Sequence, residues 1–377
     1  MGACRPSLAG PTRRSFFPMR GAPERRRLSF LGLVLAATLL AAAAGPASEA
    51  PSASSLGPSL RDEDGRFTNP VGGLTHGSFG VRFPFMLRRI AGSFRERPGV
   101  PARMANDGAF LRENATHSVP TVTWIGHATL LVQMGHTSFL TDPIWSDRPS
   151  PVSFVGPRRH VPPGVALDDL PPIDFVVVSH NHYDHLDLPT LEALARRSPE
   201  TRFIVPLANG DTLRSEGIEN VTELDWGEST LIEGVRIHCL PAQHWSLRAF
   251  DGERRSLWAS WAVVSEERRF YFAGDTGYFD GFARIAEALG PFDLAAVPIG
   301  AYEPRAMMRE SHMNPEEAAR AASDLDANRA LAMHYGTFDL SDEPLDEPPK
   351  RFRAAAAENG FSGGDTWVLN VGETREF

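Results

Sequence analysis

A cluster of metal-binding residue types directly after an apolar run constrains this chain more than any other feature. Residues 175–178 read Phe-Val-Val-Val, which predicts a buried strand. His180, His182, Asp184 and His185 then place three imidazoles and a carboxylate within six positions. Such groups are costly to bury for packing alone, and together they suit zinc and related divalent ions. The cluster therefore predicts a metal site at the end of a core strand.

Three single residues of the same types follow other apolar runs. His244, Asp275 and His334 each come just after a predicted strand. Strands that end at one edge of a sheet direct the residues beyond them into one cleft, so residues far apart in sequence meet there. One such histidine or aspartate is more often structural. Four ligand-bearing strand ends together favour a dinuclear metal site.

Short strands and helices mix throughout residues 118–377. Strands are expected at 122–125, 128–132, 138–141, 175–178, 203–205, 235–240, 257–264, 270–272, 294–299 and 331–333. Helices are expected at 188–197, 278–289, 315–325 and 351–357. Asn314 is the expected N-cap of the third helix, with Pro315 at its first position. The pattern predicts one α/β domain with layered sheets and helices outside.

The first 117 residues differ from this pattern. Three arginines, an apolar stretch at 28–44 and small residues indicate an export signal or N-terminal anchor over residues 1–47. Residues 12–17 resemble a twin-arginine signal, so we expect export to the periplasm or cell envelope. An uncleaved membrane anchor is the alternative. Residues 48–117 are rich in Pro, Gly, Ser and Arg and predict an irregular lead-in, with a short basic helix at 87–94.

The charge and the cysteine content of the chain exclude some binding partners and some kinds of metal site. The chain carries a formal net charge of −9. Seven arginines and two acidic residues fall within residues 1–50, so the remainder carries −14. No basic surplus is left to neutralise nucleic-acid phosphates, and we expect no nucleic-acid partner. Cys4 and Cys239 have no CxxC partner, which excludes a thiolate metal cluster and a disulfide scaffold.

The order HxHxDH, then His, Asp and His, resembles the metallo-β-lactamase superfamily. Further segments are similar to the N-acylphosphatidylethanolamine-hydrolysing phospholipase D family, at residues 124–129, 140–143, 180–187, 243–245, 272–278 and 290–305. The last of these, reading GPFDLAAVPIGAYEPR, is the most specific. The resemblance covers the chain from about Pro120 onward. It implies an αββα sandwich with a dinuclear metal site at one edge of the two sheets.

The resemblance also implies a ligand set for two zinc ions. One ion would be held by His180, His182 and His244, the second by Asp184, His185 and His334, and Asp275 would bridge them. Two such cations lower the pKa of a shared water and produce hydroxide near neutral pH. The resemblance implies that this hydroxide attacks the phosphorus of N-acylphosphatidylethanolamine, so that N-acylethanolamine and phosphatidic acid are released.

Other residues receive roles around these ligands. Asp184 could also orient the attacking water, His312 is the candidate proton donor or orienting group, and His127 is expected beside the ligands. Substrate contact is expected from Tyr183, Tyr302 and Arg158.

The same set of ligands is also compatible with other functions. A lactone or ester hydrolase resembling ascorbate-phosphate lactonases would use the same ligands. A non-catalytic binding protein would only hold metal or ligand, although the complete ligand set argues against this reading. A phospholipid substrate implies contact with a membrane surface, and in an acidic body this contact must be apolar or come from the N-terminal segment. A homodimer is also left open by the sequence.

Overall fold

The computed structural model describes residues 53–92, 98–152, 154–248 and 252–377. All of them belong to one compact unit that runs from Ala50 to Phe377. The expected export signal at residues 1–47 lies outside the described residues. Within the described ranges, no helix combines the length and apolarity that are needed to cross a bilayer.

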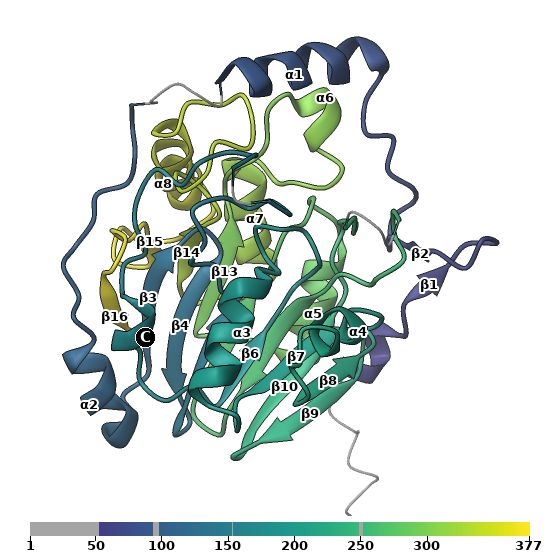
Figure 1. Ribbon diagram of the computed structural model, residues 1–377. Helices are drawn as coiled ribbons and strands as arrows, with labels where there is room; N and C mark the ends of the chain where they lie inside the picture. The colour runs from purple at the N-terminus through teal and green to yellow at the C-terminus, as the bar shows by residue number, and fades with distance from the viewer. Residues whose placement is uncertain (1–52, 93–97, 153, 249–251) are drawn as a thin grey trace, which may run out of the picture. The chain divides into compact units, whose positions relative to one another are not determined.

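Two seven-stranded mixed sheets form the centre of the fold (Figure 1). The first has the order β16 (Thr374–Glu376), β3 (Thr121–Gly126), β4 (Thr129–Met134), β5 (Thr137–Thr141), β6 (Phe175–Val177), β7 (Arg202–Pro206) and β8 (Val221–Leu224). The second has the order β15 (Thr366–Trp367), β14 (Ala330–Met333), β13 (Leu294–Pro298), β12 (Arg269–Phe272), β11 (Ser260–Val264), β10 (Val235–Leu240) and β9 (Ser229–Ile232). A separate two-stranded ribbon pairs β1 (Leu60–Arg61) with β2 (Phe67–Thr68).

Strand direction brings the ends of several strands to one edge. In the first sheet, β5 to β8 run parallel to one another. In the second sheet, β12 to β15 run parallel, and β10 runs the same way because it is antiparallel to β11, which is antiparallel to β12. The residues that follow these strands therefore leave each sheet on a common side.

Both faces of each sheet are covered, which explains the apolar runs in the strands. In β6, Phe175 and Val177 point into the core between the sheets, whereas Val176 packs in a second core under α3 (Leu188–Arg197). In β4 the apolar side chains alternate between the same two cores. A strand buried on both faces needs apolar residues at successive positions.

Helices cover the outer faces of the two sheets. The second core holds residues of α2 (Ala109–His117), α3 and α4 (Gly210–Arg214), and the larger core holds residues of α5 (Gly281–Leu289), α7 (Pro315–Asp324) and α8 (Glu347–Glu358). The remaining helical elements are η1 (Ala53–Leu56), α1 (Phe79–Gly92), η2 (Leu167–Asp169) and α6 (Arg305–Met308). The layers confirm the expected αββα sandwich.

Some predicted elements differ from the observed ones. The strand expected at 257–264 begins only at Ser260, because residues 257–259 bond to segments outside the second sheet. The amide of Leu257 donates to the carbonyl of Leu207, and the amide of Ala259 donates to the carbonyl of Ser179. The helix expected at 278–289 begins at Gly281, and the one expected at 351–357 begins at Glu347, with prolines in its first turn.

The lead-in is more ordered than expected. Its described residues include the β1–β2 ribbon, a 14-residue α1 in place of the short helix predicted at 87–94, and α2. The segment also bonds to the body: the Asn69 side chain accepts from the amide of His244 (2.8 Å), and Gln243 exchanges two hydrogen bonds with the backbone of Val71. These partners are far away in sequence, so local composition could not reveal them.

Helix α7 begins with a capping box, as its expected N-cap requires. The Asn314 side chain accepts from the amide of Glu317 (2.9 Å), and the Glu317 carboxylate accepts from the amide of Asn314 (3.1 Å). Two amides at the helix start are thereby satisfied.

We expect Asn314→Ala to lower the free energy of unfolding by about 1 kcal/mol, the usual cost of losing an N-cap. Denaturant titration followed by circular dichroism measures the change. Asn328→Ala is the matched control, because Asn328 is exposed. Equal stability of the two variants would contradict the capping role.

Candidate metal centre

Residues that follow strands of both sheets meet at one edge. His180 to His185 follow β6, His244 follows β10, Asp275 follows β12 and His334 follows β14. His127 joins them from the turn between β3 and β4, where it takes a positive φ of 53°. All seven expected ligands belong to groups whose donor atoms lie within 4.8 Å of one another.

His180, His182 and His244 form the first group. Nδ1 of His182 lies 2.8 Å from Nε2 of His180 and 3.3 Å from Nε2 of His244. Nδ1 of His244 donates to the carbonyl of Ser311 (2.9 Å), which leaves Nε2 as the inward lone pair. Burial lowers the pKa of all three rings, to about 4 for His182. Neutral imidazole is the form that binds a metal ion.

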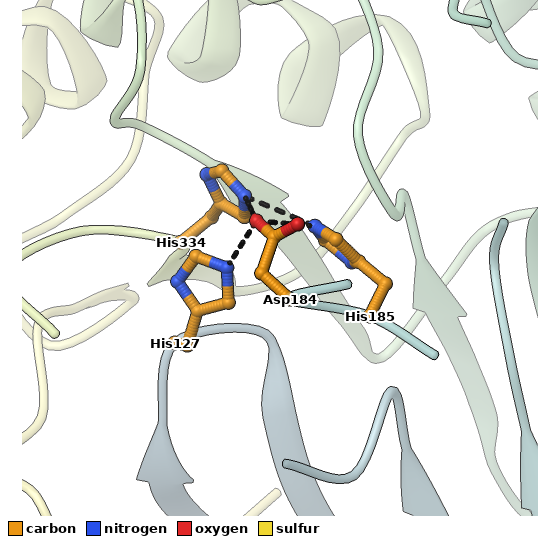
Figure 2. A group of neighbouring side chains, drawn as sticks. All are labelled: His127, Asp184, His185 and His334. Atoms are coloured by element: carbon orange, nitrogen blue, oxygen red, sulfur yellow. Dashed lines mark hydrogen bonds and ion pairs between the residues drawn. The ribbon is translucent and has the colours of Figure 1, made fainter. Parts of the chain in front are cut away.

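His127, Asp184, His185 and His334 form the second group (Figure 2). Figure 2 shows the Asp184 carboxylate between the three rings. Its Oδ2 accepts from Nε2 of His127 at 2.9 Å and lies 3.3 Å from His185 Nε2 and 3.6 Å from His334 Nε2. Burial lowers the pKa of His127 to about 3, with the charge of His334 adding to the effect. His127 therefore stays neutral and holds Asp184 in place by hydrogen bonding.

Asp275 lies against both groups. Its carboxylate oxygens lie 3.0 Å from His334 Nε2, 3.2 Å from His185 Nε2 and 3.9 Å from His244 Nε2. Burial opposes ionisation, but His185 and His334 outweigh it and hold the pKa of Asp275 well below its usual range. This is the position that a bridging carboxylate requires.

An aspartate outside the predicted site aligns two of the ligands. Asp142 follows β5 and is fully buried. It accepts from His185 Nδ1 (2.6 Å) and from the Ser179 amide and hydroxyl (both 2.6 Å). Because the Ser179 hydroxyl donates to Asp142, its oxygen is free to accept from Nδ1 of His180 at 2.9 Å. Asp142 thus directs Nε2 of both histidines inward.

The donor set fits a pair of divalent cations. Burial lowers the pKa of His334, but Asp275 and Asp184 outweigh it and raise the pKa to about 9. The same balance, with Asp142 added, raises the pKa of His185 well above its usual range. The buried carboxylates thus favour a positive charge at these two rings, and a divalent cation bound to the neutral rings would supply that charge in place of the two protons. In the first group three neutral nitrogens converge, and a cation among them would give each a partner.

A cavity of about 400 Å³ opens above the centre. His182, Asp184, Asp275 and His334 line its floor together with His312, whose Nδ1 lies 3.8 Å from Asp275 Oδ2. The walls are mainly apolar and include Phe85, Trp245, Leu247, Met307, Met308 and Leu340. The cavity therefore joins a charged floor to walls that suit an apolar substrate.

The three residues expected to contact substrate do not line this cavity. Tyr302 is fully buried, and its hydroxyl donates to Glu347 Oε1 (2.8 Å). Tyr183 packs under the guanidinium of Arg248, 4.2 Å from its ring centroid. Arg158 is exposed on a loop outside the cavity lining. Being close in sequence to the site did not place these side chains in it. The neighbouring residues His182, Asp184 and Ala301 do line the cavity, but the Tyr183 ring packs against Arg248 and the Tyr302 hydroxyl bonds to Glu347.

Two cavity residues were missed by the sequence analysis. His76, from the lead-in, packs edge-on against Trp245 at 4.7 Å, and its Nε2 lies 3.1 Å from Glu253 Oε1. Both His76 and Glu253 line the cavity. Neither follows a predicted strand, so the signal that identified the ligands does not apply to them. Asp142, in contrast, does end a strand, and that signal could have found it.

We expect Asp142→Asn to reduce metal affinity about 10- to 100-fold, because it removes the charge that orients His185 and, through Ser179, His180. Metal content after dialysis against graded chelator measures the change. Asp174→Asn is the matched control, since Asp174 accepts a backbone amide at the opposite end of β6. Unchanged retention in Asp142→Asn would contradict the positioning role.

Comparison with known proteins agrees with this geometry. A family profile described as Beta-lactamase superfamily domain matches residues 137–335, more than half of the chain. The chain is 46% identical over 228 residues to N-acyl-phosphatidylethanolamine-hydrolyzing phospholipase D 1 of Caenorhabditis elegans; the match covers 58% of this chain and 64% of that protein, just under two thirds of its length. It is 31% identical over 257 residues to a metal-dependent hydrolase of Methanopyrus kandleri, covering 68% of this chain and 99% of the relative.

The fold is also found among solved structures. A metallo hydrolase from Ignicoccus hospitalis matches with a TM-score of 0.52 at 22% identity, covering 69% of this chain and 98% of that one. At this identity the likeness concerns the fold. Together with the family profile and the sequence relatives, it identifies the chain as a metal-dependent hydrolase that belongs to the metallo-β-lactamase superfamily.

Proposed function

We propose that this hydrolase is a zinc-dependent phosphodiesterase of phospholipase D type. Its substrate is N-acylphosphatidylethanolamine or a related phospholipid, and its products are N-acylethanolamine and phosphatidic acid. The observation that carries the proposal is the floor of the cavity, where two ligand groups joined by Asp275 lie beneath apolar walls. The similarity to N-acyl-phosphatidylethanolamine-hydrolyzing phospholipase D 1 of Caenorhabditis elegans supports the choice of bond. Export by the N-terminal segment is part of the same proposal.

In this proposal each ligand group holds one metal ion. His180, His182 and His244 would hold one ion, and Asp184, His185 and His334 the other, with Asp275 between them. When bound, the metal pair supplies Lewis acidity and a water of lowered pKa. Asp184 is held by His127 and reaches the cavity, so it can also accept a hydrogen bond from the attacking water.

The cavity walls suit a lipid diester. A phosphodiester on the floor would lie beside His312, Asp184 and Asp275, and acyl chains would contact the apolar walls. Arg82 is an exposed arginine that lines the cavity, and it can pair with the phosphate of a lipid headgroup. The shape and polarity of the cavity therefore favour an amphipathic substrate.

His312 serves this reaction best as a neutral hydrogen-bond donor. Burial lowers the pKa of His312 to about 4, so its ring is neutral at neutral pH. A neutral imidazole donates a hydrogen bond to a phosphoryl oxygen or to water, whereas an acid catalyst must first be protonated. This refines the expectation from sequence that His312 supplies the proton to the leaving group.

The bond that is hydrolysed is tested by a direct comparison of substrates. We expect metal-quantified protein to release N-acylethanolamine and phosphatidic acid from N-acylphosphatidylethanolamine faster than it opens lactones or simple esters. Asp275→Asn should lower this turnover more than about 100-fold, because it loses the charge shared by both ligand groups. His238→Gln is the control, since His238 is a buried histidine outside the ligand groups. Turnover of lactone alone would instead identify the protein as a lactone hydrolase, the alternative given in the sequence analysis.

A second test concerns His312. We expect His312→Ala to lower kcat about 100-fold with little change in KM, because a donor to the reacting phosphoryl group is lost. His312→Gln should restore part of the rate, since an amide can donate in place of the ring. The activity of His312→Gln should keep the wild-type pH profile from pH 6 to 8. An alkaline limb present in the wild type and absent from His312→Gln would instead show that the ring delivers a proton.

A further inference from the structure

Helix α1 carries an apolar face that no part of the described chain covers. Phe79, Phe83, Met86 and Leu87 are 78%, 44%, 50% and 50% exposed. At 100° per residue they fall within an arc of about 100°, so they form one stripe along the helix. The rings of Phe79 and Phe83 stack at 5.4 Å. Contiguous exposed apolar side chains of this size mark a contact surface.

The opposite side of α1 belongs to the metal centre. Arg82 and Phe85 line the cavity. Arg89 pairs with Asp339 (2.6 Å) and Asp342 (3.1 Å), and Arg88 also pairs with Asp342. Both aspartates lie in the loop that follows His334. Ion pairs therefore hold α1 at the rim of the cavity, with its apolar stripe turned away from the body, and Figure 1 shows α1 lying beside α6.

We propose that the outer face of α1 docks onto a phospholipid bilayer and places the cavity entrance at the lipid headgroups. The choice of lipid as partner rests on the proposed function. A helix that lies in a membrane interface combines an apolar stripe with flanking basic residues. α1 has this composition, with three arginines and no acidic residue between Phe79 and Gly92.

Charge and area both favour a bilayer over a second copy of the chain. Arg88 and Arg89 pair with Asp339 and Asp342, so among the described residues Arg82 is the arginine of α1 that remains available to an anionic lipid headgroup. A stable dimer buries about 800 Å² on each partner, with 20–30 residues. Four side chains on one helix supply only a small part of such an interface, whereas they are enough to anchor a helix that lies in the headgroup layer of a membrane.

Docking in this orientation gives the lipid a short route to the metal centre. Arg82 and Phe85 lie on the same helix as the stripe and face the cavity. A phosphodiester leaving the headgroup layer would meet Arg82 first, and its acyl chains could follow Phe85 toward the methionines of the wall. The diester would thus reach the floor without crossing bulk water.

Site-specific fluorescence tests the docking directly in the full-length protein. In a Cys4→Ser background, a polarity-sensitive dye is attached at Phe83→Cys or, as a control, at Leu231→Cys; Cys239 is buried and stays unlabelled. Leu231 is 52% exposed and lies on β9, far from α1 in Figure 1. We expect vesicles of phosphatidylcholine and phosphatidylglycerol to shift the emission to the blue at position 83 only, and less without phosphatidylglycerol.

Activity separates docking from catalysis. We expect the double variant Phe79→Ser, Phe83→Ser to lose at least tenfold in rate on N-acylphosphatidylethanolamine in vesicles, and to keep wild-type turnover of the soluble diester bis(4-nitrophenyl) phosphate. Leu231→Ser should keep both activities. Insertion of α1 without hydrolysis of the lipid would overturn the phospholipase function and leave the docking intact.

Three results would overturn the docking itself. The first is an unchanged emission at position 83 on addition of vesicles, and the second is full vesicle activity in the double variant. The third is a blue shift that grows with protein concentration in the absence of lipid, together with dimer formation in sedimentation. This third result would assign the stripe to contact between copies of the chain.

Discussion

The balance between buried carboxylates and buried imidazoles is the constraint on which the site depends. Without Asp275 and Asp184, burial would lower the pKa of His334; with them, the pKa is raised to about 9. Each carboxylate in turn stays ionised because His185 lies 3.2 to 3.3 Å away. Charges removed from water need partners of opposite sign at close range. The two sheets must therefore present their strand ends at fixed positions.

The ligands could be predicted from sequence because their positions follow from strand geometry. An apolar run that ends in His or Asp specifies both the strand and the residue beyond it, and parallel strands bring such residues to one edge. His244 and His334 were identified in this way although they are 90 positions apart. The layered fold was equally accessible, because the fully apolar strand at Phe175–Val177 already required cover on both faces.

The rest of the site depends on side-chain direction and on contacts that sequence does not encode locally. Tyr302 is near the site in the chain, but its ring turns inward to Glu347. His76 comes from a Pro- and Gly-rich stretch without periodicity, and it reaches the cavity only because the lead-in bonds to the loop around His244. Asp142 does follow a strand, but the ligands it orients, His185 directly and His180 through Ser179, are known only when the hydrogen bonds are traced.

The lead-in contributes residues to the cavity above the metal centre. The family profile matches residues 137–335, so Phe85, Arg82 and His76 lie outside it and yet form part of the cavity wall. The floor holds the candidate metal ligands, and the walls define the space through which a substrate would reach them. The lead-in thus completes a wall whose other apolar residues, among them Trp245, Met307 and Met308, come from the matched region, so both parts of the chain determine the polarity of the cavity.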